Sequence, residues 1–186
     1  MIRPSASKPG IEDALSEAFA SQRSELLWLA FLLTGDRGLS VEAVAGAMDM
    51  EDAGNPFFRN WMISWSRKLV IAKALGTVEP RMAASIERTR ERRVPARTEM
   101  PFGGWSLQKT AGKAELERAL LAIDLFPRCA LLLTVFEKVS LDDTASLLNA
   151  DRESVRHAKT IGLAELTWFL ALPPPELSPT AGVAFA

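Results

Sequence analysis

Apolar residues recur at helical spacing along most of this chain, and this periodicity constrains the fold more than any other feature. The strongest instance is a stripe at i, i+3, i+4, i+7, i+11 and i+14, formed by Phe58, Trp61, Met62, Trp65, Leu69 and Ala72. Such a stripe is one apolar face of an amphipathic helix. No segment shows the alternation of β-branched and polar residues that is typical of a half-buried strand. The sequence therefore predicts an all-α protein.

Two helices are expected before this stripe, each bounded by residues that favour helix ends. The first begins at Ile11, and its apolar face is formed by Leu26, Leu29, Ala30 and Leu33. Gly35 is expected to end it, because glycine readily adopts the left-handed conformation that follows many helices. Ser40 is expected to cap a short helix from Val41 to about Met48. Gly76 is the expected C-cap of the long amphipathic helix.

Residues 77–113 differ from the rest of the chain in composition. They hold eight cations against four anions, a net charge of +4, and the cations are Arg81, Arg88, Arg90, Arg92, Arg93, Arg97, Lys109 and Lys113. Pro95, Pro101 and two glycines at 103–104 disfavour a continuous helix. Two interpretations fit this segment. It is either a solvated connector with one short helix near Met82 to Arg92, or a surface patch that contacts phosphates.

The basic segment predicts a division of the chain into two small helical domains joined by a linker. The expected parts are a flexible N-terminus at 1–10, a helical domain at 11–78, a basic Pro/Gly linker at 79–113, a second domain at 114–172 and a disordered tail at 173–186. A length of 186 residues suffices for two domains of this size. In the second domain, Pro127 is expected in the first turn of a helix, where its missing N–H is not needed.

The second domain contains the pattern of two capped helices joined by a tight turn. Ser140 is a typical N-cap, and Asp143 can return a hydrogen bond to it. Asn149 stands where the turn needs a left-handed residue, and Asp151 can cap the second helix. Small Ala145 allows the two helices to approach closely. This pattern predicts a C-terminal helix-turn-helix, although a helical hairpin without a ligand has the same caps and spacing.

Candidate DNA-binding residues follow the second cap. In a helix docked in the major groove, residues near its N-terminus meet bases and cations meet phosphates. On this basis the candidate DNA-binding residues are Arg152, Ser154, Arg156, His157, Lys159 and Thr160. Val155, Gly162, Leu163 and Leu166 are expected to face the interior. Arg156 could contact a base edge or a phosphate, and phosphate contacts are the more common kind.

The sequence gives little support to an enzyme, a metal site or a membrane protein. Cys129 lies in an apolar run and His157 is the only histidine, so no Cys–His pair or metal-ligand spacing is present. No glycine-rich phosphate loop occurs, and no catalytic residue, metal or cofactor is expected. The longest apolar run, Leu26 to Leu33, is far shorter than the ~20 residues that span a bilayer. A single thiol fits the reducing cytoplasm, which is the expected location.

Three stretches resemble the extracytoplasmic-function sigma factors, a small two-domain class of the bacterial sigma family. Residues 32–37 resemble a helix end of the family's core-binding domain, and residues 55–72 resemble its Phe-x-x-Trp helix. Residues 125–166 resemble its promoter-reading domain. The resemblance implies binding to RNA polymerase core and to promoter DNA, with polymerase contacts at Asp36 and Glu42. It also raises an anti-sigma factor as a further partner.

The chain departs from the family pattern at several positions. Ala43 and Gly46 replace an Asp and a Gln that face the polymerase, and an acidic segment at 48–55 replaces the aromatic, basic helix that melts promoters. Ala158 and Ile161 stand where the recognition helix usually carries arginines. Two hypotheses remain. The protein is either a sigma-factor-like transcription initiation protein, or a sigma-like interaction and regulatory module that has lost promoter melting.

Overall fold

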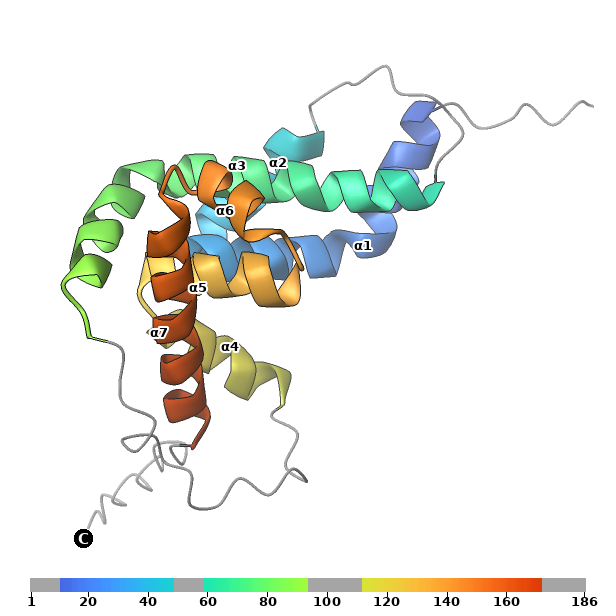
Figure 1. The fold of residues 1–186 in the computed structure, drawn as a ribbon. Coiled ribbons are helices and arrows are strands. Elements are labelled where there is room, and N and C mark those ends of the chain that lie inside the picture. The colour runs from blue at the N-terminus through green and yellow to red at the C-terminus, as the bar shows by residue number, and fades with distance from the viewer. Residues whose placement is uncertain (1–10, 49–58, 94–111, 172–186) are drawn as a thin grey trace, which may run out of the picture.

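The computed structural model describes residues 11–48, 59–93 and 112–171, with the side chains of 11–21 and 59–64 left out. Every regular element in these ranges is helical, which confirms the all-α prediction. The elements are α1 (Ile11–Thr34), α2 (Arg37–Met48), α3 (Arg59–Arg90), α4 (Lys113–Ala122), α5 (Leu125–Leu131), a five-residue π-helix η2 (Leu132–Phe136), α6 (Leu141–Leu147) and α7 (Arg152–Ala171) (Figure 1).

In the turn between α1 and α2, the residue that ends α1 is the predicted one, but the residue that caps α2 is not. Gly35 has a φ of +71°, and its amide donates to the carbonyl of Phe31 at 2.8 Å, so it ends α1 as predicted. Ser40, however, is buried inside α2 and donates to the carbonyl of Arg37 at 2.7 Å. The capping residue is instead Asp36, whose Oδ1 accepts the amide of Leu39 at 2.9 Å.

Helix α3 is longer than the sequence predicts. It runs through Gly76 and Pro80 to Arg90, so the predicted C-cap at Gly76 and the start of the linker at residue 79 are wrong. Proline removes the amide that would bond the carbonyl four residues earlier, here that of Gly76. Both residues are exposed, so water can satisfy this carbonyl. The C-terminal part of α3 turns away from the direction of its first part (Figure 1), as a proline inside a helix commonly causes.

A buried stripe explains why the helix continues. Val78, Met82, Ser85 and Thr89 follow one another at spacings of four, three and four residues, and each is less than 7% exposed. This face packs inward, while the arginines of the same segment lie on the surface. The first part of the expected linker, residues 79–90, is therefore helical, and residues 94–111 lie outside the described part of the chain, as do 1–10 and 172–186.

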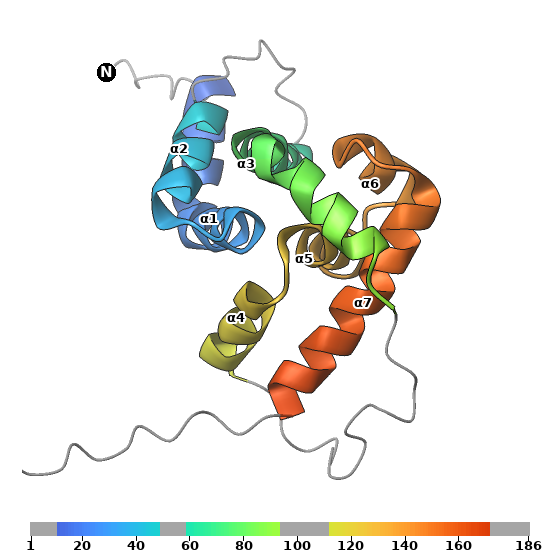
Figure 2. The same cartoon turned by 90° about the vertical axis from the view of Figure 1, so that its left-hand side faces the viewer.

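Helix α5 occupies the middle of the structure. All seven of its residues are buried, including Arg128 and Pro127, which stands in the first turn as expected. In Figure 2 α5 lies at the centre of the view, with α3, α4 and α7 around it, and it contacts both α3 and α7. Buried side chains of α1, α2, α3, α4, α5, η2, α6 and α7 belong to one hydrophobic cluster. Because the halves share this core, the predicted division into two domains is not confirmed.

Polar contacts reinforce the junction between the two halves. The buried hydroxyl of Ser85 in α3 accepts the amide of Phe126 in α5 at 2.8 Å. Arg88 forms two hydrogen bonds to Asp124, at 3.0 and 2.9 Å. Partial burial raises the pKa of Asp124, but hydrogen bonds from Arg88 and from the backbone amide of Leu125 outweigh it and hold that pKa below its ordinary value. The start of α5 is thereby fixed to the end of α3.

We predict opposite effects of alanine at two helical glycines. A Cβ on Gly162 in α7 would lie 2.7 Å from the carbonyl oxygen of Pro127 in α5. This oxygen belongs to the backbone, so it can move away only if α5 shifts relative to α7. Gly162→Ala should therefore lower the free energy of unfolding by about 1–3 kcal/mol, the usual cost of overpacking. Gly76→Ala meets no atom within 4 Å and should raise it by about 0.5–1 kcal/mol, because alanine is the better helix former.

Urea unfolding followed by circular dichroism measures both variants against the wild type. A neutral or stabilising Gly162→Ala would contradict the close approach of α5 and α7. A destabilising Gly76→Ala would contradict the continuation of α3 through this residue.

Candidate nucleic-acid interface

Helix α6 begins and ends as the sequence predicts. The hydroxyl of Ser140 accepts the amide of Asp143 at 3.1 Å, which caps the helix. The same hydroxyl lies 2.7 Å from a carboxylate oxygen of Asp143 and donates to it, so the return bond involves the Ser140 side chain and not its backbone. Asn149 has a φ of +48° in the turn that follows, which confirms the left-handed position. Thr144, Ala145 and Leu148 are buried beneath the turn.

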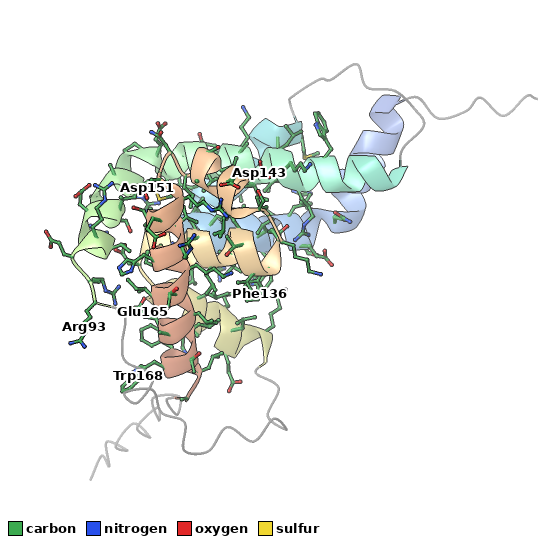
Figure 3. The ribbon with its side chains drawn as sticks, viewed as in Figure 1. Arg93, Phe136, Asp143, Asp151, Glu165 and Trp168 are labelled. Atoms are coloured by element: carbon green, nitrogen blue, oxygen red, sulfur yellow. The ribbon has the colours of Figure 1, made fainter. Side chains whose placement is uncertain are left out.

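Asp151 caps α7 and orders its first turn. Its carboxylate accepts the amide of Ser154 at 2.7 Å and the hydroxyl of Ser154 at 2.6 Å. These two hydrogen bonds lower the pKa of Asp151 below its ordinary value. Figure 3 places Asp143 and Asp151 at the same end of the molecule, near the turn, and Glu165 and Trp168 farther along α7. Ser154, a predicted DNA-binding residue, is thus engaged in the cap.

Three of the predicted DNA-binding residues share one exposed face of α7. Arg152, Arg156 and Thr160 follow each other at intervals of four residues, and all three are exposed. The hydroxyl of Thr160 donates to the carbonyl of Arg156 at 2.9 Å. Each guanidinium has a carboxylate close by. Arg152 lies 3.3 Å from Asp142, and Arg156 lies 2.6 Å from Glu153.

The other predicted residues are less accessible. Lys159 is half-buried, and His157 lies beside the end of α3, with its Nε2 3.0 Å from the carbonyl oxygen of Arg92. Since a carbonyl only accepts, Nε2 carries the proton in this bond. Ala158 and Ile161 are buried in the core, which accounts for their lack of charge. Leu163 was expected to face inward, but it is 49% exposed, so this prediction is wrong.

The end of α3 adds cations beside the start of α7. Arg90 lies 3.9 Å from Asp151, and a cleft of about 290 Å³ between the helices is lined by Arg90, His157 and Ser154. Arg93 projects from the end of α3 (Figure 3) and is exposed. Residues 140–160 alone hold four carboxylates against three cations, a net charge of −1. Arg90 adds one cation beside the cap, whereas Figure 3 shows Arg93 level with Glu165 and away from Asp151.

The predicted polymerase-binding residues lie elsewhere. Asp36 and Glu42 are both exposed, near the α1–α2 turn and on α2. Figure 2 shows α2 on one side of the molecule and α7 on the other, with α3 and α5 between them. The structure therefore separates the two predicted surfaces. It does not bring Asp36 or Glu42 to the DNA-binding candidates.

The structural part played by the arginines at the end of α3 and just after it is not predicted by the sequence pattern. Arg88 pairs with Asp124, and Arg92, two residues beyond α3, pairs with Glu165 of α7. Arg128, which is only 6% exposed, is likewise not marked by any sequence pattern. The extension of α3 could have been recognised from the helical spacing of Val78, Met82, Ser85 and Thr89. Ser85 and Thr89 are polar, however, so a search for apolar periodicity does not include them.

Three further observations concern metal ligands, the cysteine and membrane spans among the described residues. No group of three or more His, Cys, Asp or Glu side chains in ranges 11–48, 59–93 and 112–171 could hold a metal ion. Burial raises the pKa of the Cys129 thiol to about 12, so the thiol stays protonated. No helix in those ranges is long and apolar enough to cross a membrane. Comparison with models of protein families, with curated proteins and with solved structures finds no match.

We predict that Ser154→Ala raises the pKa of Asp151 towards the ordinary value of an aspartate. The substitution removes the hydroxyl that contributes most to the depressed pKa, while the backbone bond from residue 154 remains. Carboxyl carbon shifts followed by NMR during a pH titration measure this change. Ser146→Ala is the control, because that hydroxyl donates to the carbonyl of Asp142 instead. An unchanged pKa in Ser154→Ala would show that the hydroxyl of Ser154 does not donate to the carboxylate of Asp151.

Proposed function

We propose that α6 and α7 form a helix-turn-helix that binds duplex DNA, in a cytoplasmic, sigma-factor-like transcription initiation protein. The observation that carries this proposal is the exposed row of Arg152, Arg156 and Thr160 at the start of α7. A capped turn and a buried inner face hold this row in place. In helix-turn-helix proteins the corresponding residues of the second helix enter the major groove.

On binding DNA, Arg152 and Arg156 would exchange their carboxylate partners for phosphates of the duplex. The pairs of Arg152 with Asp142 and Arg156 with Glu153 are solvent-exposed, with side-chain exposures between 55% and 73%. Exposed ion pairs contribute little stability, about 0–1 kcal/mol each, so their loss costs little. A guanidinium on a phosphate forms two charge-assisted hydrogen bonds and releases condensed counterions. Arg90, which lines the cleft beside Asp151 and Ser154, would add a further phosphate contact near the start of α7.

The partner proposed for the opposite side is RNA polymerase core, as the family resemblance implies. The exposed carboxylates of Asp36 and Glu42 are the proposed contacts, and a basic surface on the polymerase would complement them. Because α2 and α7 face different directions (Figure 2), the polymerase and DNA could bind together. An anti-sigma factor that covers either surface would block one of these interactions.

A second candidate function is supported by the shared core. A sigma factor that reads two promoter elements needs its two halves at separate positions on DNA, whereas here α1, α3, α5 and α7 pack around one cluster. The net charge of −1 in residues 140–160 also weakens attraction to phosphate. These observations favour a regulatory module that binds polymerase or a regulator without melting promoters.

We predict that Arg156→Ala weakens DNA binding by removing a phosphate contact. Affinity should fall for all sequences alike, and the slope of log K against log salt concentration should shrink by about one unit. If Arg156 contacts a base edge instead, the variant should no longer discriminate among bases at one position of the site, and the free energy of binding should weaken by about 1–3 kcal/mol. Fluorescence anisotropy with promoter fragments across a salt series distinguishes the two roles.

Arg152→Ala should behave in the same way, and Arg23→Ala is the matched control, since Arg23 is exposed on α1 away from α7. If the Arg152 and Arg156 variants bind DNA as the control does, the helix-turn-helix proposal fails. Copurification with RNA polymerase core, without run-off transcription and without DNA binding, would then identify the regulatory module.

A further inference from the structure

A polar cavity of about 610 Å³ lies at the junction of the two halves. It is lined by the end of α1, by Arg81 and Arg88 of α3, by Arg92 just after α3, by the connection between α4 and α5, by Arg128 of α5 and by Glu165 of α7. Its volume is in the range of pockets that bind small molecules. The predicted DNA-binding residues do not line it, so the proposal below goes beyond the proposed function and does not depend on it.

Cations outnumber anions in this cavity. Its walls carry Arg81, Arg88, Arg92 and Arg128 against Asp124 and Glu165, an excess of two positive charges. Arg88 pairs with Asp124, and Arg92 pairs with Glu165. Within the described part of the chain, Arg81 and Arg128 have no carboxylate within 4.0 Å. These two guanidiniums therefore supply the excess charge.

Arg128 is an unusual residue for a helix interior. Its side chain is buried, with 6% of the residue exposed, and its Nη1 donates only long bonds to the carbonyls of Leu121 and Ile123, at 3.3 and 3.2 Å. Its Nε has no partner among the described residues. A buried cation without a counterion in direct contact is costly. Burial lowers the pKa of Arg128 below its ordinary value and the charge of Arg81 adds to this effect, although the charge of Asp124 partly offsets it.

Two residues near Arg128 shape the cavity: Gly35 leaves space for its guanidinium, and Glu165 supplies a second polar group. Gly35 lies against Arg128, and a Cβ on it would be 3.0 Å from Nη2, so the bare glycine lets the guanidinium approach the end of α1. Glu165 also lines the cavity, and its Oε2 is buried and has no hydrogen-bond partner among the described residues. Arg81 donates to the carbonyl of Thr34 at 2.9 Å, so the incompletely bonded groups in the walls are the guanidinium of Arg128 and the carboxylate of Glu165.

We propose that this cavity binds a small phosphorylated molecule that also carries a hydroxyl group. The guanidiniums of Arg81 and Arg128 would hold the phosphate, because their planar donors match phosphate oxygens and neutralise two charges. Oε2 of Glu165 would accept the hydroxyl. Such a ligand would contact α1, α3, the α4–α5 connection and α7 at once, and would stabilise the packing of the two halves by mass action.

Isothermal titration calorimetry of the full chain with ribose 5-phosphate and with inorganic phosphate, at matched ionic strength, tests this proposal. Both probes should bind saturably, with ribose 5-phosphate the tighter. Arg81→Gln should weaken both by about tenfold or more, the effect of losing a charge-assisted hydrogen bond. Arg81→Lys should recover part of the loss. Arg81 is exposed, so these variants should fold, and circular dichroism checks this.

Arg118→Gln is the matched control, because Arg118 is exposed on α4 and does not line the cavity. Its affinity for both probes should equal that of the wild type. The proposal is overturned if neither probe binds saturably, or if Arg81→Gln and Arg118→Gln bind both probes equally. DNA binding by Arg156→Ala tests the proposed function separately, so either proposal can fail alone.

Discussion

The hydrogen bond from the amide of Phe126 to the hydroxyl of Ser85 is the contact on which the arrangement of the helices depends. Helix α5 is buried along its whole length, so the free amides at its start need partners inside the protein. Asp124 satisfies one and Ser85 satisfies another. Ser85 belongs to α3 and Asp124 is held by Arg88 of the same helix. The C-terminal half can therefore occupy this position only if α3 continues past Pro80.

The helices and caps were largely predictable from the sequence, since they depend on local spacing and on single side chains such as Ser140, Asn149 and Asp151. The extension of α3 was not, because Gly76 and Pro80 are ordinary helix breakers. Their effect is outweighed by the burial of Val78, Met82, Ser85 and Thr89 against the rest of the protein, and two of these four residues are polar. The pairing of the α3 arginines depends on partners far along the chain, which no local pattern reveals. For the same reason the basic linker was predicted where the structure has a packed helix.

The arginines between residues 81 and 92, together with Arg128 of α5, connect the functional proposals to the fold. Arg88 and Arg92 are paired across the junction, where they bind the two halves together. Arg81 and Arg128 face a cavity without a carboxylate of their own in the described part of the chain, which is the basis of the proposed phosphate site. Arg90 lies beside the start of α7, next to the proposed DNA-binding surface. One basic segment thus serves stability, a proposed ligand and a proposed nucleic-acid surface.

The central claim is that both halves share one cooperative core, and native-state hydrogen exchange across a denaturant series tests it most directly. Amides at residues 29–33 in α1 and 129–133 in α5 and η2 are helical and lie in or beside this core. The account predicts that both groups open with the same free energy and the same denaturant dependence, as one unit. Opening of residues 129–133 at a clearly lower free energy, while residues 29–33 stay protected, would contradict it and show two independent domains.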